Sequence, residues 1–70
     1  MYYIQCTVNR RKVPFCQLHM FWDGWDEIPF EARFLCGHPK SRKPLEPLRK
    51  YLIKHGIPAK ILHAHCPTTL

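Results

Sequence analysis

The stretch that decides the fold is YYIQCTVNRRKVPFCQLHMFW, residues 2–22. In its first half, the residues at even positions from Tyr2 to Val8 are all apolar. Alternation of period two is typical of a strand with one buried face. The basic residues that follow are few enough to form a hairpin loop before a second strand. A loop centred on Arg11 places Cys6 opposite Cys16, and this register keeps the even-numbered residues of both strands on one face.

The rest of the chain predicts two more strands and one helix. Residues 28–36, IPFEARFLC, alternate like a third strand after the turn DGWDE, and residues 59–66, AKILHAHC, form a fourth. Between them, leucines at helical spacing precede a helix stop at His55 and Gly56. The stripe consists of Leu45, Leu48 and Leu52. The expected fold is α+β, a small and mainly antiparallel sheet in the order β-β-β-α-β with one helix packed on one face. It forms a single domain over residues 1–70, and a right-handed crossover would make the third and fourth strands parallel.

The positive charge lies almost entirely in the second half of the chain. The formal net charge is +6, and bases and acids cancel before Gly37, whereas Glu46 is the one acid after it. Such asymmetry points to a polyanion or to an acidic partner surface, and the alternative is a solvated face that keeps a small protein soluble. The predicted anion-binding residues are Lys40, Arg42, Lys43, Arg49, Lys50 and Lys54, with Arg10, Arg11 and Lys12 at the hairpin tip.

Aromatic residues add a second candidate surface. Aromatics interleaved with bases on an open sheet face resemble a stacking platform for single-stranded nucleic acid, and exposed tryptophans mark interfaces of any kind. The predicted contact residues are Tyr3, Phe15, Phe21, Trp22 and Trp25. The expected function is therefore a small, basic nucleic-acid-binding or regulatory module. The alternative is a small protein-binding inhibitor of the phage or plasmid type that docks on an acidic surface of a host protein. A second copy of the chain, as in a homo-oligomer, would also suit this face.

Cysteines and histidines close the third and fourth predicted strands. If these strands are parallel neighbours, their ends meet at one sheet edge, where Cys36, His38, Cys66 and either His63 or His65 would suit tetrahedral zinc. Our candidate set takes His65 as the fourth ligand, although no C-x-x-C motif supports it. Two alternatives remain open. The four cysteines would need no cofactor as small core residues, or they would form the disulfides Cys6–Cys16 and Cys36–Cys66 in an oxidising compartment.

Localisation and catalysis rest on weaker patterns. The chain opens without a basic segment followed by an apolar run, and no stretch approaches membrane-spanning length, so we expect a cytoplasmic protein that does not enter a membrane. No nucleophile motif, phosphate-binding glycine loop or carboxylate pair is present, which predicts a protein that is not an enzyme. The alternative is a small ribonuclease in which His63 and His65 act as acid and base.

Overall fold

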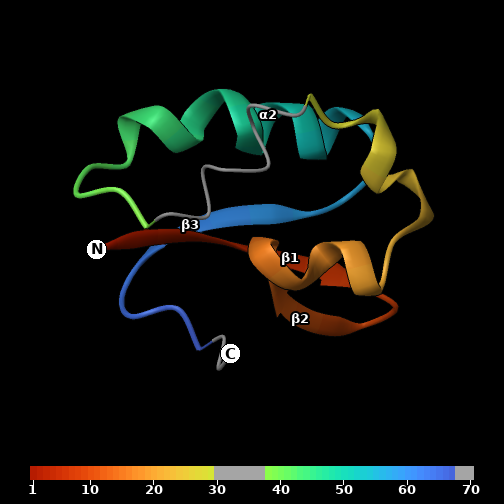
Figure 1. The fold of residues 1–70 in the computed structure, drawn as a ribbon, viewed down its shortest axis with the longest axis horizontal. Coiled ribbons are helices and arrows are strands. Elements are labelled where there is room, and N and C mark those ends of the chain that lie inside the picture. Colours follow the sequence, from red (N-terminus) through yellow and green to blue (C-terminus); the bar gives the residue numbers. More distant parts are fainter. Residues whose placement is uncertain (30–37, 68–70) are drawn as a thin grey trace.

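The computed structural model describes residues 1–29 and 38–67 of the chain. Within them, three strands form an antiparallel sheet in the order β2-β1-β3, and one α-helix packs on it (Figure 1). The predicted α+β class, with a small antiparallel sheet and one helix, is confirmed. The elements are β1 (Tyr2–Val8), β2 (Arg11–Pro14), the 3-10 helices η1 (Phe15–Met20), η2 (Asp23–Glu27) and η4 (Lys43–Leu45), α2 (Glu46–Lys54) and β3 (Ala59–His63).

β1 is the central strand, and its alternating pattern sets the core. Ile4 and Cys6 of the predicted inner face of β1 are buried, whereas Tyr2 and Val8 are half-buried and Tyr3, predicted on the other face, is buried as well. Cys6 lies opposite Val13 of β2, and Ile4 lies opposite Ile61 of β3. One face of the sheet therefore carries apolar residues from all three strands. Hydrogen bonds on both edges therefore fix β1 in the middle of the sheet.

The hairpin register differs from the prediction. Asn9 and Arg10 both have positive φ angles, 52° and 66°, and they connect β1 directly to β2. Two left-handed residues are the signature of a type I′ turn, whose twist matches that of the flanking strands. The turn is thus centred before Arg11 and not on it. As a result Cys6 pairs with Val13, and the predicted pairing of Cys6 with Cys16 is wrong.

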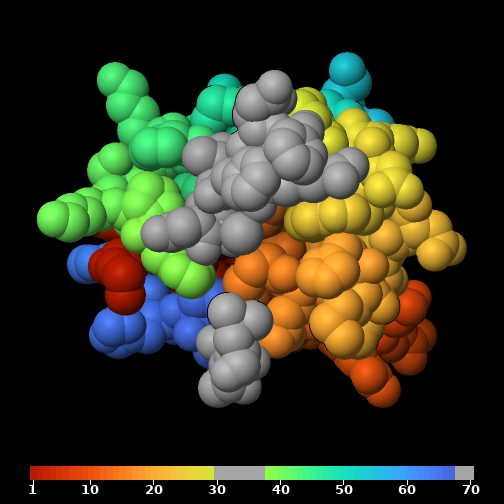
Figure 2. All heavy atoms as spheres, viewed as in Figure 1, coloured from red at the N-terminus to blue at the C-terminus, as the bar shows by residue number. Residues whose placement is uncertain are grey.

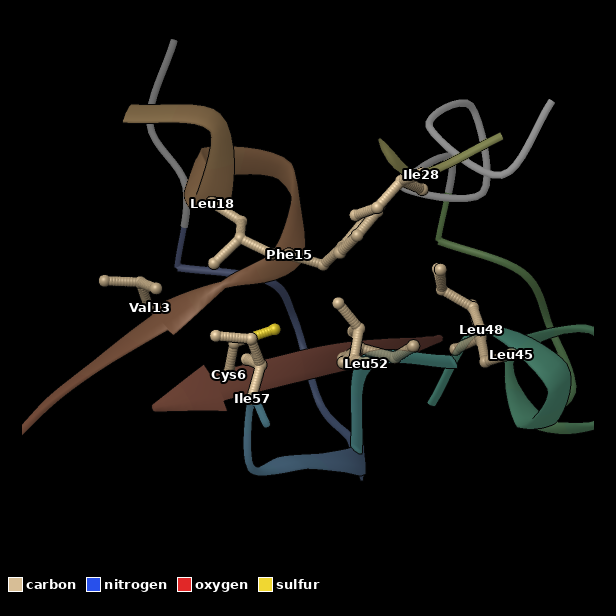
Figure 3. Close-up of a cluster of buried hydrophobic side chains, with 10 residues drawn as sticks. Cys6, Val13, Phe15, Leu18, Ile28, Leu45, Leu48, Leu52 and Ile57 are labelled. Atoms are coloured by element: carbon tan, nitrogen blue, oxygen red, sulfur yellow. The ribbon is translucent and has the colours of Figure 1, made fainter. Parts of the chain in front are cut away.

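The second strand is also shorter than expected. We predicted that it would run on to Trp22, but it ends at Pro14 and the chain enters η1. Proline has no amide donor for the sheet ladder, which explains why pairing stops there. In η1 the side chains of Phe15 and Leu18, three residues apart, both point into the core. Figure 3 shows them among the buried residues.

The third predicted strand falls mostly outside the described residues, as does its parallel crossover to the fourth. Its first residue, Ile28, is buried in the core without being part of a strand. The fourth predicted strand corresponds to β3, which is shorter than the pattern and pairs antiparallel with β1. The predicted turn DGWDE corresponds to η2.

The helix follows its sequence pattern closely. Leu45, Leu48 and Leu52 are buried against the sheet, as predicted (Figure 3). The helix ends at Lys54, and Gly56 then takes a φ of 84°, which suits glycine best among the residues. This turn lets the Ile57 amide donate back to the Leu52 carbonyl at 2.9 Å. The predicted stop at His55 and Gly56 is therefore confirmed.

The turn gives a direct test of the register. Arg10→Gly should raise the free energy of unfolding by about 0.5 kcal/mol, because relief of the left-handed strain exceeds the added freedom of the unfolded chain. Arg11→Gly, one position on and inside β2, should lower it by about 0.5–1 kcal/mol. Urea unfolding followed by tryptophan fluorescence measures both variants. The opposite order of stabilities would favour the loop centred on Arg11.

Candidate metal centre and cationic surface

Two cysteines and one histidine from three distant parts of the chain meet in the structure. Cys16 lies in η1, His38 precedes η4, and Cys66 follows β3. One ligand atom of each residue lies within 4.8 Å of the other two. The two sulfur atoms are 3.5 Å apart, and all three residues are half-buried. Two thiols and an imidazole at this spacing are the donor groups of many zinc sites.

Local structure explains how the three residues reach one place. Because β2 stops at Pro14, Cys16 leaves the sheet in the first turn of η1. The Tyr2 amide donates to the Pro39 carbonyl at 3.0 Å, and this bond holds the segment carrying His38 beside the start of β1. After β3 the chain turns back beneath the sheet (Figure 1). Cys66 follows in this segment and lies beside Cys16 and His38.

His38 carries the clearest unsatisfied group in the described residues. Its Nε2 atom is buried and has no hydrogen-bond partner among them. A buried polar atom without a partner costs free energy, and native structures rarely leave one without a reason. The His38 backbone also adopts a φ of 58°, which is uncommon for a residue other than glycine. With its proton on the other ring nitrogen, the imidazole would present a lone pair at this buried atom.

A small apolar hollow lies beside the two sulfurs. Its volume is about 10 Å³, which is about the room that one water molecule or ion needs. It is lined by Tyr3, Ile4, Phe15, Cys16, Leu45, Leu48 and Cys66. The walls are thus mostly core side chains, and the thiols of Cys16 and Cys66 are the groups among them that suit a soft metal ion.

The predicted metal set is only partly brought together. His38 and Cys66 lie in the cluster, as the zinc hypothesis requires, but His65 is exposed and is not one of its members. Cys36 lies outside the described residues, so its predicted role and its proximity to Cys66 stay predictions. Sequence reasoning missed Cys16, because the assumed strand continued through it. Pro14 was the available signal, since a proline inside an apparent strand argues that the strand ends there.

The first predicted disulfide is absent. Cys6 and Cys16 form no bond, and the sulfur of Cys16 instead lies beside that of Cys66. Cys6 is completely buried in the core, as the alternative of a packed thiol proposed. Burial, with a smaller effect from Cys16, raises the pKa of the Cys6 thiol to about 12. The second predicted disulfide involves Cys36 and lies outside the described residues.

The lysines of α2, of η4 and of the segment before η4 are exposed. Lys40, Lys43, Lys50 and Lys54 all reach solvent, and no acid among the described residues pairs with them. Glu46 instead binds two arginines of the predicted set. Its carboxylate lies 3.0 Å from Arg49 and 3.3 Å from Arg42. The hydrogen bond from Arg49, with the charges of both arginines, lowers the pKa of Glu46.

The remaining predicted cations lie on a different side of the molecule. Arg10, Arg11 and Lys12 are exposed at the hairpin tip. The tip projects at the opposite corner from the green segment before α2 (Figure 2). Lys12 also lies opposite Thr7, and Lys60 opposite Gln5, on the face of β1 that points away from Cys6 and the core. A shallow groove there has a volume of about 210 Å³ and is lined by Gln5, Thr7, Lys12, Pro58, Ala59 and Lys60.

Two of the five predicted aromatic contact residues are buried. Tyr3 is only 9% exposed and Phe15 only 3%, so neither can stack on a base. The reason for Phe15 is its position in η1, where it packs against Trp25 at a ring distance of 5.0 Å. Trp22 and Trp25 are half-buried against the core, and Phe21 alone of the five is clearly exposed.

Comparisons with protein-family models, with curated proteins and with solved structures found no match. In residues 1–29 and 38–67, no helix has both the length and the apolar character needed to cross a bilayer.

His63, one of the two residues of the ribonuclease alternative, stacks its ring on Tyr2 at 4.4 Å. The chemistry of this protein is therefore inferred from the residues just described.

The burial of Cys6 predicts both its reactivity and a pH effect. At pH 8, with a chelator present, iodoacetamide should alkylate Cys16 and Cys66 well before Cys6, because the Cys6 thiol is buried and protonated. In the folded protein the pKa of the Cys6 thiol is higher than in the unfolded chain, so only the unfolded chain loses this proton between pH 9.0 and about 12. The free energy of unfolding is therefore not reduced by this group below pH 9.0, and it falls as the pH rises toward about 12.

Peptide mass spectrometry of the alkylated protein measures the order of reaction. Alkylation in urea, where all the thiols are accessible, is the control. Equal rates for Cys6 and Cys66 under native conditions would contradict the buried position of Cys6.

Proposed function

We propose that this protein is a non-enzymatic module that binds nucleic acid through the lysines of α2 and of the loop before it. The observation that carries the proposal is that four exposed lysines pair with no acid in residues 1–29 and 38–67. They are Lys40, Lys43, Lys50 and Lys54. Glu46, the one acid nearby in the sequence, is already bound by arginines. These four residues define the lysine surface.

The helix leaves this surface available because its other side holds it on the sheet. Lys50 and Lys54 are one turn apart, and each lies two positions after a buried leucine of the stripe. Two positions along a helix are about 200° of rotation, so these lysines point away from the core. Mobile lysines of this kind neutralise phosphates without reading bases. We therefore expect binding that depends strongly on salt and little on nucleotide sequence.

Buried aromatic residues support the same interpretation of the contact. With Tyr3 and Phe15 in the core, stacking contributes less than the sequence suggested, and charge becomes the main source of affinity. The hairpin tip lies at the opposite corner of the molecule from the segment before α2 (Figure 2), and Lys12 lies on the outer face of the sheet, so a short ligand on the lysine surface would not reach them. Because the two groups are separate, each can be reversed without disturbing the other.

Charge reversal tests the proposal. Lys50→Glu with Lys54→Glu should weaken binding of a fluorescein-labelled oligonucleotide by roughly tenfold or more. It should also reduce the slope of log affinity against log salt by about two, because two phosphate contacts are lost. Stability should change little, since exposed charges contribute little to folding. Fluorescence anisotropy with single-stranded and duplex DNA and RNA, at several salt concentrations, measures the effect.

The matched control reverses Lys12 and Lys60, which changes the net charge equally but on the opposite face. This variant should bind almost as well as the unchanged protein. Equal losses in the two variants would mean that only net charge matters. Binding that ignores both salt and reversal would contradict the proposal and favour docking on a host protein. In that case Met20 and Phe21, which are 69% and 37% exposed, become the contact residues to test.

The labelled RNA should be recovered intact after incubation, as expected of a protein that is not an enzyme. Cleavage that disappears in His63→Ala or His65→Ala would favour the ribonuclease alternative.

A further inference from the structure

We infer that Cys16, His38 and Cys66 together bind one Zn²⁺ ion, through two thiolates and one imidazole nitrogen. This site does not depend on the proposed binding of nucleic acid. Its ligands differ from the sequence-based set, because Cys16 joins His38 and Cys66 and His65 is excluded. The argument rests on distance, on the buried imidazole and on the chemistry of the donors.

The distances fit a tetrahedral ion. Zn–S bonds of about 2.3 Å at tetrahedral angles place two sulfurs about 3.8 Å apart. The Cys16 and Cys66 sulfurs are 3.5 Å apart, and all three ligand atoms lie within 4.8 Å of one another. Small side-chain rotations would bring them to bonding distance. Three donors thus lie close to the positions that zinc requires.

The buried nitrogen of His38 is the second, independent observation. Nε2 has no hydrogen-bond partner in the described residues, although its place in the interior makes that costly. A metal ion bound by the lone pair of this atom would remove the cost. The neutral imidazole would then act as a ligand, with its proton on the other ring nitrogen.

The donor set selects the metal. Two thiolates and one imidazole suit zinc, whereas calcium and magnesium need oxygen ligands. The walls of the adjoining hollow are largely apolar, which suits a soft metal ion better than a hydrated hard cation. A stabilising role suits this site, because the three ligands join η1, the segment before η4 and the segment after β3. A chain of 70 residues has a small core, and such a link adds to its stability.

Metal analysis of the 70-residue protein, purified with zinc present, tests the inference. We expect about one zinc per chain, and Cys16→Ser, His38→Ala and Cys66→Ser should each lower zinc affinity by at least about a hundredfold. The matched controls are Cys6→Ala, a buried thiol outside the cluster, and His65→Ala, an exposed histidine of the same segment as Cys66. Both controls should retain zinc.

X-ray absorption of the unchanged protein keeps the test decisive if the ligand variants fail to fold. The zinc spectrum should contain sulfur at about 2.3 Å, together with nitrogen at about 2.0–2.1 Å. Three results would overturn the inference: zinc absent from the purified protein, a coordination shell without sulfur, or full zinc retention in Cys16→Ser. A mass lower by two hydrogens with a linked Cys16–Cys66 peptide would also overturn it, because a disulfide consumes both thiolates.

Discussion

The structure depends on a central strand that is hydrogen-bonded along both edges. β1 pairs with β2 on one side and with β3 on the other, and its inner face supplies Ile4 and Cys6 to the core. The leucine stripe of α2 packs on that face, and the turn after the helix returns the chain to form β3. A sheet of three short strands is stable only if one face is buried. The apolar cluster that joins the inner face of β1 to the buried leucines of η4 and α2 and to the side chains of η1 therefore holds the fold together.

The same strand organises the cysteine and histidine cluster. The Tyr2 amide at its start holds the segment of His38 through the Pro39 carbonyl. The early exit of the chain at Pro14 brings Cys16 out of the sheet, and the return of the chain after β3 brings in Cys66. The first of these steps is a backbone hydrogen bond, and the second follows from the missing amide donor of Pro14. The fold thus brings the donors together. An ion bound by them would in turn link η1, the segment before η4 and the segment after β3.

The charged and the apolar residues of α2 lie on opposite sides of the helix, so the lysines are available for a ligand. α2 uses one side for the core and leaves Lys50 and Lys54 on the other, while Arg42 and Arg49 are occupied by Glu46. The groove with Lys12 and Lys60 lies on the outer face of the sheet. These two cationic regions cannot both contact a short, straight ligand, because the sheet and the helix lie between them. The aromatic residues, by contrast, contribute mainly to packing.

The sequence by itself determined the features that depend on local periodicity. The alternation around Ile4 and Cys6, the leucine stripe of α2 and the stop at Gly56 all followed from the spacing of apolar residues and from glycine chemistry, and with them the α+β class. Tertiary structure alone decided the hairpin register, because a two-residue turn at Asn9 and Arg10 shifted the pairing away from Cys16. It also decided the metal candidates. The sequence alone identifies His38 and Cys66 as residues that can bind zinc. Residues so far apart in the chain form one site only when the folded backbone has brought them together.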